Sequence, residues 1–551
     1  MKNHFSTNRF TAFLLVVLLF LSLSMQAVTT TYYFYVQFSN KNDTPYSLSN
    51  PSQYLSQRAI ERRTAFAISY DSTDLPVNPS YLQQIESIGI PVHNKSKWMN
   101  GATVLLEDSS KMSLVRALPF VKWVQYTGKN ELPPSGSPRK IKSEVTFEYG
   151  TANTQINQIS GKFLHDNGFR GKNIHVGVID AGFMNVNTNP AFDSLRLQGR
   201  LLGTKDIINP NSNIYAEDAH GANVLSIMTG NLPNQYLGTA PDASYWLIRT
   251  EYAPTEYKVE TDFWSSGIEF ADSVGVDVVN SSLGYYTFDD TSMSFSYADM
   301  NGTVSRASRA ANLASKKGMI LVISAGNEGS KSWHYIGSPA DAQGIVTAGG
   351  VQADGLPSVF SSFGPSSDGR VKPEICAQGT STSVINTNGI RVYGNGTSYS
   401  SPVLAGMMAS YLQAAKKTFP PYNVATLIQN VINSASLFNN PTAQMGYGVP
   451  NFEYAARNLP FFTGFTEIEA NKNFNLAYDF NNMTIQIWMP NRMESIGKTI
   501  QLYAMNGKMM LQRPMSETMN SINVAKFPVG IYAVCIFGNG ISETRKILIQ
   551  K

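Results

Sequence analysis

Cysteine is nearly absent from this sequence, which has two, Cys376 and Cys535, in a chain of 551 residues. Two cysteines exclude a framework of several disulfides, and no cysteine cluster indicates a zinc site. We expect both to be buried as small apolar side chains, as free cysteines usually are. A large net charge is also lacking, since the formal net charge is +4 and charged residues make up 15% of the chain. Nothing in this balance indicates a nucleic-acid binder.

Long apolar runs are lacking beyond the first 27 residues. Lys2 and Arg9 precede an uninterrupted apolar run at 13–21, and small or polar residues follow as far as Ala27. The run is shorter than the ~20 apolar residues that cross a bilayer, and its flanks are typical of a secretory signal peptide. We predict a signal peptide at 1–27, cleavage near Ala27 and a mature chain that is soluble outside the cytoplasm.

Residues 28–145 are predicted to form a small α+β domain with a linker. The hydrophobic pattern predicts strands at 32–38, 90–93, 102–107 and 121–125 and helices at 81–88 and 112–118. Two helices against four strands suit a split βαβ arrangement. Residues 127–144 are rich in Gly, Pro, Ser and Lys, which indicates an exposed linker.

Residues 146–456 alternate between apolar strands and helices. The pattern predicts strands at 174–180, 244–250, 276–280 and 319–324, and helices at 262–274, 304–317 and 402–416. Strands that are apolar throughout and separated by helices predict an α/β domain whose parallel sheet is covered on both faces. Functional residues of such sheets gather at the carboxyl ends of the strands, where Asp180 and the segment 324–327 lie.

Residues 457–551 are predicted to form a small all-β domain. Asn506-Gly507 separates an expected strand at 499–505 from one at 508–512, and Asn539-Gly540 separates 531–537 from 541–549. Asn-Gly between two strands is a strong signal for a hairpin.

Four segments of the middle domain carry residues with chemical potential. Asp180 ends an apolar strand, His220 begins an expected helix, Asn327 follows a strand between glycines, and Ser398 lies in a Gly-rich turn before Pro402. Each has an ordinary explanation alone: a turn residue, a structural histidine or a helix cap. The four together, in the order Asp, His, Asn, Ser, suggest nucleophilic catalysis.

These segments resemble the subtilase family of serine peptidases, whose chain order is Asp, His, Ser. The resemblance covers about 300 residues and rests on 176–182, 220–224, 324–329 and 394–402. Departures are Ala222-Asn223 after His220-Gly221, a Tyr399-Ser400-Ser401 run after Ser398, and Tyr285 where a small residue is common.

The resemblance implies a subtilisin-like fold and a role for each residue. His220 would take the proton of Ser398 as general base, and Asp180 would hold the imidazole. The side-chain amide of Asn327 and the backbone N–H of Ser398 would bind the oxyanion. Ser282, Leu283 and Gly284 would form an edge on which a peptide or protein substrate adds as an antiparallel strand. No organic cofactor is implied, and we assign no metal ligands, although a structural calcium ion is compatible with the family.

The flanking regions also resemble known domains. Residues 28–145 are similar to subtilase propeptides, which implies that the chain binds its own propeptide; a permanent accessory domain is the alternative. Residues 457–551, with Leu502-Tyr503, 506–508, 528–532 and a basic end, resemble the C-terminal sorting domains of the type IX secretion system. That resemblance implies recognition by secretion machinery and a secreted or surface-attached protein. A generic β-sandwich that binds substrate or carbohydrate is the alternative.

The sequence therefore predicts a secreted serine endopeptidase made as a proenzyme. One alternative is a catalytically silent surface-binding protein on the same scaffold, which an intact Asp180, His220, Ser398 and Asn327 set argues against. Another is a different serine hydrolase, such as an esterase. The chain has no Gly-x-Ser-x-Gly elbow, and the chain order of that fold is Ser, Asp, His.

Overall fold

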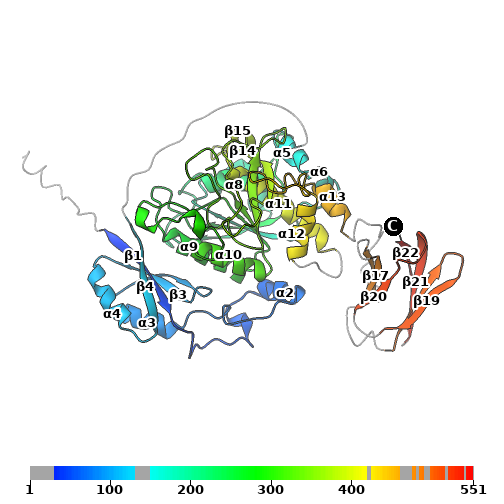
Figure 1. Ribbon diagram of the computed structural model, residues 1–551, viewed down its shortest axis with the longest axis horizontal. Helices are drawn as coiled ribbons and strands as arrows, with labels where there is room; N and C mark the ends of the chain where they lie inside the picture. Colours follow the sequence, from blue (N-terminus) through cyan, green and yellow to red (C-terminus); the bar gives the residue numbers. More distant parts are fainter. Residues whose placement is uncertain are drawn as a thin grey trace, which may run out of the picture.

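The computed structural model describes residues 30–130, 149–417, 424–459, 474–479, 483–488, 497–515, 519–538 and 541–549. The predicted signal peptide and most of the predicted linker lie outside these residues. Three units follow one another along the chain: an N-terminal α+β unit, a large α/β unit and a C-terminal all-β unit (Figure 1). No helix within the described ranges is long and apolar enough to cross a membrane.

The N-terminal unit is an antiparallel sheet with the strand order β2-β3-β1-β4. Helices α3 and α4 cover one face, where apolar side chains of strands and helices form a core. The elements are β1 Thr31–Phe38, α2 Gln57–Ala65, α3 Pro79–Ser87, β2 Val92–Ser96, β3 Gly101–Leu106, α4 Met112–Arg116 and β4 Val121–Asn130. The four predicted strands and two predicted helices are confirmed, with ends that differ by a few residues.

Two features of this unit were not predicted. Strand β4 continues to Asn130, because residues 128–130 pair with the start of β1, so the expected linker begins later than residue 127. Helix α2 was missed altogether. Its buried side chains are Ala59, Arg62 and Arg63, so the face that it buries carries charge and gives no apolar periodicity.

The α/β unit is built on a seven-stranded sheet with the order β13-β12-β11-β10-β5-β9-β6. Every neighbouring pair is parallel, as predicted. The strands of this sheet are β5 His175–Asp180, β6 Leu201–Asp206, β9 Ser244–Arg249, β10 Val278–Ser281, β11 Ile320–Ser324, β12 Val346–Val351 and β13 Ile375–Gln378. The short hairpins are β7 Asn231–Leu232 with β8 Tyr236–Leu237, and β14 Thr382–Ile385 with β15 Arg391–Gly394.

Helices cover both faces of this sheet (Figure 1). The helices are α5 Asn153–Gln158, α6 Lys162–Asp166, α7 Asp193–Leu197, α8 His220–Thr229, α9 Glu260–Ser273, α10 Arg306–Lys316, α11 Thr397–Ala415, α12 Val424–Asn433 and α13 Phe452–Arg457. One apolar core joins the sheet to α8 and α11. The other joins it to α9 and α10, and Tyr33, Tyr35 and Trp98 of the N-terminal unit complete that core. The N-terminal unit is therefore docked on the α9–α10 face.

Helix α11 begins earlier than predicted. Pro402 was expected to open the helix, but the helix starts at Thr397 and contains Pro402. A proline inside a helix removes the N–H that would donate to the carbonyl four residues earlier, here that of Ser398. The hydroxyl of Ser282 donates to this carbonyl instead, at 2.9 Å, so the first turn stays helical.

The C-terminal unit is a small all-β sandwich, as predicted. One sheet has the order β16-β17-β20 and the other β19-β18-β21-β22, and their inner faces share one apolar core. The strands are β16 Asn475–Asp479, β17 Thr484–Trp488, β18 Thr499–Ala504, β19 Met509–Pro514, β20 Met519–Asn523, β21 Gly530–Gly538 and β22 Ile541–Ile549. Asn506-Gly507 makes the predicted turn, with Gly507 at φ 83°. Residues 539 and 540 lie outside the described ranges.

Candidate active site

Asp180 and His220 meet where a strand ends and a helix begins. Asp180 is the last residue of β5 and fully buried, and His220 is the first residue of α8. The imidazole Nδ1 donates to Oδ1 of Asp180 at 2.7 Å, and the N–H of Ala181 donates to the same oxygen at 2.9 Å. Gly221 makes this approach possible, since a Cβ there would lie 2.3 Å from the carbonyl oxygen of Gly182.

The surroundings of His220 favour its protonated form. Burial alone would lower the pKa of His220, but the charge and hydrogen bond of Asp180, with the charges of Glu251 and Asp218, outweigh it and raise the pKa to about 9. The side chain keeps 31% of its area exposed, so solvent screens part of this attraction. The main-chain N–H of His220 donates to Asp218 Oδ1 at 2.7 Å, which caps the start of α8.

Ser398 lies in the first turn of α11 and is partly exposed. Its hydroxyl donates to the carbonyl of Ser282 at 3.3 Å, and no hydrogen bond to His220 occurs among the described contacts. The next residue, Tyr399, lies beside His220 with ring centroids 6.2 Å apart. Serine–histidine contacts at reaction centres are often long until substrate is bound.

Asn327 lies beside the same helix start. Its Oδ1 accepts from the N–H of Thr397 at 2.8 Å and from the Thr397 hydroxyl at 3.1 Å. A backbone N–H can only donate, so this contact identifies the amide oxygen. The Nδ2 donors are left unused by the described residues, next to a helix N-terminus that favours negative charge.

Ser282, Leu283 and Gly284 follow directly after β10. The hydroxyl of Ser282 holds the carbonyl of Ser398, so this segment adjoins the start of α11. Gly284 is exposed, and the nearest atom to an added Cβ would be 3.8 Å away. Tyr285, which stands where a small residue is common, is fully buried and pairs its backbone with Ser338, so Gly284 is the open position of this edge.

The structure thus brings Asp180, His220, Asn327 and Ser398 to one end of the parallel sheet, with the segment 282–284 beside them. Sequence reasoning missed Asp218 and Glu251, which act on His220. The Asp218 signal is an Asp two residues before a helix start, a common cap. Glu251 had no sequence signal, because its importance depends on the pairing of β9 with β5.

Both cysteines are free. Cys376 is buried as predicted, and burial raises the pKa of its thiol to about 12. Cys535 is only half-buried, so the prediction is wrong for this residue. It lies on the four-stranded sheet of the C-terminal unit, where the hydroxyl of Thr544 donates to its sulfur. Within the described ranges, no group of three or more His, Cys, Asp or Glu residues could hold a metal ion.

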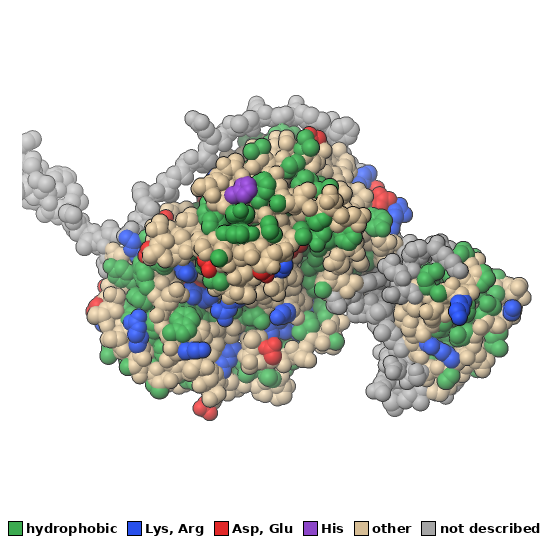
Figure 2. Space-filling view, viewed as in Figure 1, with side chains coloured by type: hydrophobic (Ala, Val, Ile, Leu, Met, Phe, Trp, Pro, Cys, Tyr) green, Lys and Arg blue, Asp and Glu red, His purple; other side chains and the backbone are tan. Residues whose placement is uncertain are grey.

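The end of the N-terminal unit contacts the segment that joins β9 to α9. The carbonyl of Thr127, near the end of β4, accepts from the N–H of Val259 at 2.8 Å, in the segment between β9 and α9. Figure 2 shows several Lys and Arg side chains on the visible face where the N-terminal unit meets the α/β unit. Strand β4 therefore ends against the segment between β9 and α9.

Comparisons with known proteins agree with this architecture. Residues 171–449 match the subtilase family, residues 33–144 match the peptidase S8 propeptide domain of Bacteroidota, and residues 470–550 match a secretion system C-terminal sorting domain. The N-terminal unit is therefore a propeptide domain. The sorting domain shows that the protein is exported, as a secreted or surface-attached protein.

Individual relatives are distant. Subtilisin NAT of Bacillus subtilis subsp. natto is 25% identical over 376 residues, which are 68% of this chain and 85% of that protein. Subtilisin DY of Bacillus licheniformis is 27% identical over 293 residues, 53% of this chain and 93% of that protein. The solved structure of the prenylagaramide maturation protease PagA aligns at 21% identity with a TM-score of 0.43, covering 54% of this chain and 98% of that chain. With a family match that spans the sheet and every segment of the site, this chain belongs to the subtilase family of serine peptidases.

Proposed function

We propose that this protein is a secreted serine endopeptidase that hydrolyses peptide bonds with Ser398 as nucleophile, His220 as general base and Asp180 as the residue that orients His220. The hydrogen bond of 2.7 Å between His220 Nδ1 and Asp180 Oδ1 carries the proposal. It holds the imidazole in the tautomer whose Nε2 is free to accept a proton.

The chemistry follows from what each group can do. His220 removes the proton of Ser398 during attack on the substrate carbonyl and returns it to the leaving amine. The oxyanion receives hydrogen bonds from Nδ2 of Asn327 and from the N–H of Ser398, and the start of α11 adds its positive dipole end. Ser282, Leu283 and Gly284 pair with the substrate backbone. The proposed reaction uses no organic cofactor.

The flanking domains bear on how this peptidase is kept inactive, activated and exported. The propeptide domain covers the α9–α10 face, and its strand β4 contacts the segment between β9 and α9, which supports an inhibited precursor. We propose that the enzyme cuts its own chain in the stretch after β4 and that export machinery recognises the sorting domain.

The test compares the wild type with Ser398→Ala after secretion, by intact mass and by labelling with a fluorophosphonate. The wild type should lose its propeptide and take up one label at Ser398, and the variant should do neither. A wild type that stays full length and unlabelled is treated with a trace of another protease and labelled again. Labelling at that stage would show that activation is external, and its absence would overturn the proposal.

A further inference from the structure

Three glutamates form a cluster where the chain passes from β9 to α9: Glu251 and Glu256 in the connecting segment, and Glu260 at the first position of α9. We call them the glutamate cluster. The N–H of Tyr252, next to Glu251, donates to Glu260 Oε1 at 3.1 Å. The N–H of Glu256 donates to Asp289 Oδ2 at 3.1 Å, and its carbonyl accepts from the N–H of Asp289 at 2.8 Å. These bonds fasten the segment to the residues that follow Gly284.

Buried oxygen atoms of the cluster lack partners. Glu260 is 2% exposed, and its Oε2 has no hydrogen-bond partner. Oε1 of Glu256 is buried without a partner as well. A buried polar group without a partner costs about 1–3 kcal/mol and more if charged, so these atoms point to a ligand that the described residues do not supply.

The cluster also lacks a counter-charge. No Lys, Arg or His within the described ranges forms an ion pair with any of the three glutamates. Burial and then the charges of Asp180 and Asp218 raise the pKa of Glu251 to about 7, against the opposing effect of His220. Burial, and then the charges of Glu251 and Asp289, raise the pKa of Glu256 to about 9. For Glu260, burial and both other glutamates raise the pKa well above its usual range.

The missing partner is a cation carried at the end of a long side chain. The three carboxylates are not grouped in a way that could hold one metal ion. An ammonium or guanidinium on a long apolar stem could instead reach past Glu251 and Glu256, which are partly exposed, toward Glu260, which is buried. Lysine and arginine side chains have this shape.

The cluster lies next to the proposed path of the substrate. Arg249 pairs with Asp180 in the sheet, so Glu251 comes two residues after a direct neighbour of the site. On the other side, Tyr285 follows the edge 282–284, and the charges of all three glutamates add to burial in raising the pKa of its hydroxyl. A peptide antiparallel to this edge has its scissile bond near Ser282 and Ser398. Its preceding residues then run past Gly284 toward Tyr285.

We propose that the glutamate cluster binds a lysine or arginine side chain of the substrate, on the N-terminal side of the scissile bond, and makes this enzyme selective for basic peptides. This inference rests on the proposed peptidase function and names the substrate class of the same site. With their raised pKa values, Glu256 and Glu260 keep their protons at neutral pH until a cation is bound. A lysine or arginine side chain beside them favours the charged carboxylates and gains an ion pair, which a neutral peptide cannot form.

The test is cleavage-site profiling of the mature enzyme on a mixed peptide library, with each cut bond identified by mass spectrometry. The wild type should show lysine or arginine enriched about tenfold at one of the four positions before the cut bond. Glu251→Gln and Glu260→Gln should lose most of this enrichment and still cut neutral peptides. The amide oxygen of Glu260→Gln can still accept from Tyr252, so the ability to become a carboxylate beside a bound cation is removed with little change in shape. Asp354→Asn, which removes an exposed charge elsewhere, should keep the wild-type pattern.

Each outcome separates this inference from the proposed function. Cleavage without enrichment of basic residues, or enrichment that survives in both glutamine variants, would overturn the inference and leave the peptidase intact. Because Glu251 is partly exposed, its variant serves as the folded test if Glu260→Gln does not fold. A wild type that cuts nothing and takes no label at Ser398 would overturn the proposed function, and the inference with it.

Discussion

In the proposed mechanism, protonation of His220 decides when Ser398 can be activated, because only the neutral imidazole accepts a proton. The raised pKa of His220 keeps the imidazole protonated at neutral pH, and the imidazole loses this proton as the pH rises toward about 9. We therefore predict that kcat/KM for a neutral peptide rises with pH along a limb that lies above the ordinary histidine pKa of 6.5. A pH–rate profile measures the position of this limb.

Glu251→Gln provides the matched comparison for that profile. Glu251 contributes to the raised pKa of His220, so its neutralisation should move the limb to lower pH. Asp354→Asn, which is exposed and on a different loop, should leave it in place. An unshifted limb in Glu251→Gln would show that this carboxylate does not act on His220.

Asn327 offers a second prediction for a single side chain. Asn327→Ala removes the proposed Nδ2 donor to the oxyanion and should lower kcat by about 100- to 1000-fold with little change in KM. The same change leaves the N–H of Thr397 without its acceptor. Asn327→Asp keeps that acceptor but cannot donate from a carboxylate, so it should be similarly slow. An Asp variant with near wild-type kcat would contradict the role of Nδ2.

The elements that position the site could be predicted to different degrees. The apolar strands and the helices between them predicted the parallel sheet. Asp180 and Asn327 were expected at the carboxyl ends of its strands. The predicted start of α11 was too late. Proline is common at the first position of a helix, so the prediction began this helix at Pro402. What keeps the helix regular before Pro402 is the bond from Ser282 to the carbonyl of Ser398, a contact over 116 residues that no local pattern reveals.

Helix α2 and the glutamate cluster were beyond prediction for a related reason. Periodicity detects apolar faces, whereas α2 buries Arg62 and Arg63 against partners in the α/β unit. Glu260 lies in the first turn of α9, where an acidic residue is ordinary, and only the fold shows it buried. The sequence pattern does not reveal charged residues whose burial depends on partners far away in the chain.

The contact between α8 and β5 gives a prediction at the level of elements. Gly221→Ala would place a methyl group 2.3 Å from the carbonyl oxygen of Gly182 and 2.8 Å from Cβ of Asp180. The helix must shift, which should lower the free energy of unfolding by about 1–3 kcal/mol and misplace His220. Denaturant unfolding in the Ser398→Ala background measures the first effect, and peptide cleavage measures the second. Activity within twofold of the wild type would show that α8 can move without harm.

Helix α6 carries a prediction about acid stability. His165 is buried, and its Nε2 bonds to the carbonyl of Thr239 at 3.0 Å. Burial lowers its pKa to about 4 from 6.5, so its stabilising effect is full above pH 6.5 and is lost as the pH falls through 4. The free energy of unfolding should fall by up to about 3 kcal/mol over this range from His165 alone. Urea unfolding of Ser398→Ala at several pH values measures the slope, and His165→Gln, which cannot titrate, should flatten it.

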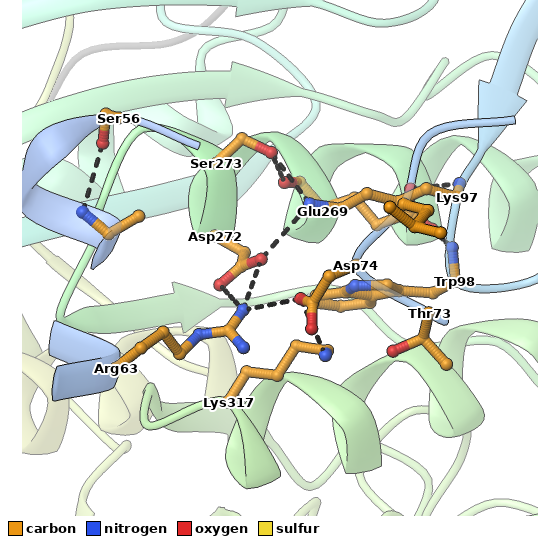
Figure 3. Close-up of polar contacts among 12 residues, drawn as sticks. Ser56, Arg63, Thr73, Asp74, Lys97, Trp98, Glu269, Asp272, Ser273 and Lys317 are labelled. Carbon is orange, nitrogen blue, oxygen red and sulfur yellow. Dashed lines mark hydrogen bonds and ion pairs between the residues drawn. The ribbon is translucent and has the colours of Figure 1, made fainter. Parts of the chain in front are cut away.

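Over the whole molecule, a buried ionic network joins the propeptide domain to the α/β unit. Figure 3 shows Arg63 of the propeptide domain pointing at both Asp272 and Asp74, with Lys317 approaching Asp74 from the α/β unit. Lys97 of the propeptide domain also reaches Asp272, at 3.3 Å. Glu269 of α9 accepts the main-chain N–H groups of Lys97 and Trp98, so side chains and backbone are bound together.

Asp272 is the centre of this network and gives the prediction for the whole molecule. Burial alone would raise the pKa of Asp272, but the charges of Lys97, Arg63 and Arg62 hold it well below its usual range. Its contribution to docking is therefore present above the ordinary pKa of 3.8 and is lost only as the pH falls through the lower value in the complex. After the proposed self-processing, the wild-type domains should still co-elute in gel filtration at pH 5.

Asp272→Asn leaves the buried Arg62 and Lys97 of the propeptide domain without this carboxylate, and leaves Arg63 with Asp74 alone. Removing one partner of a buried ion pair costs about 3–5 kcal/mol, so the affinity between the cleaved propeptide and the α/β unit should fall by at least roughly 100-fold. Gel filtration of the processed protein over a dilution series measures this affinity, and Asp354→Asn should match the wild type. Equal affinity in Asp272→Asn would mean that apolar packing through Tyr33, Tyr35 and Trp98 holds the domains together. Release of the inhibitor would then depend on digestion of the propeptide, because no single charge would control its dissociation.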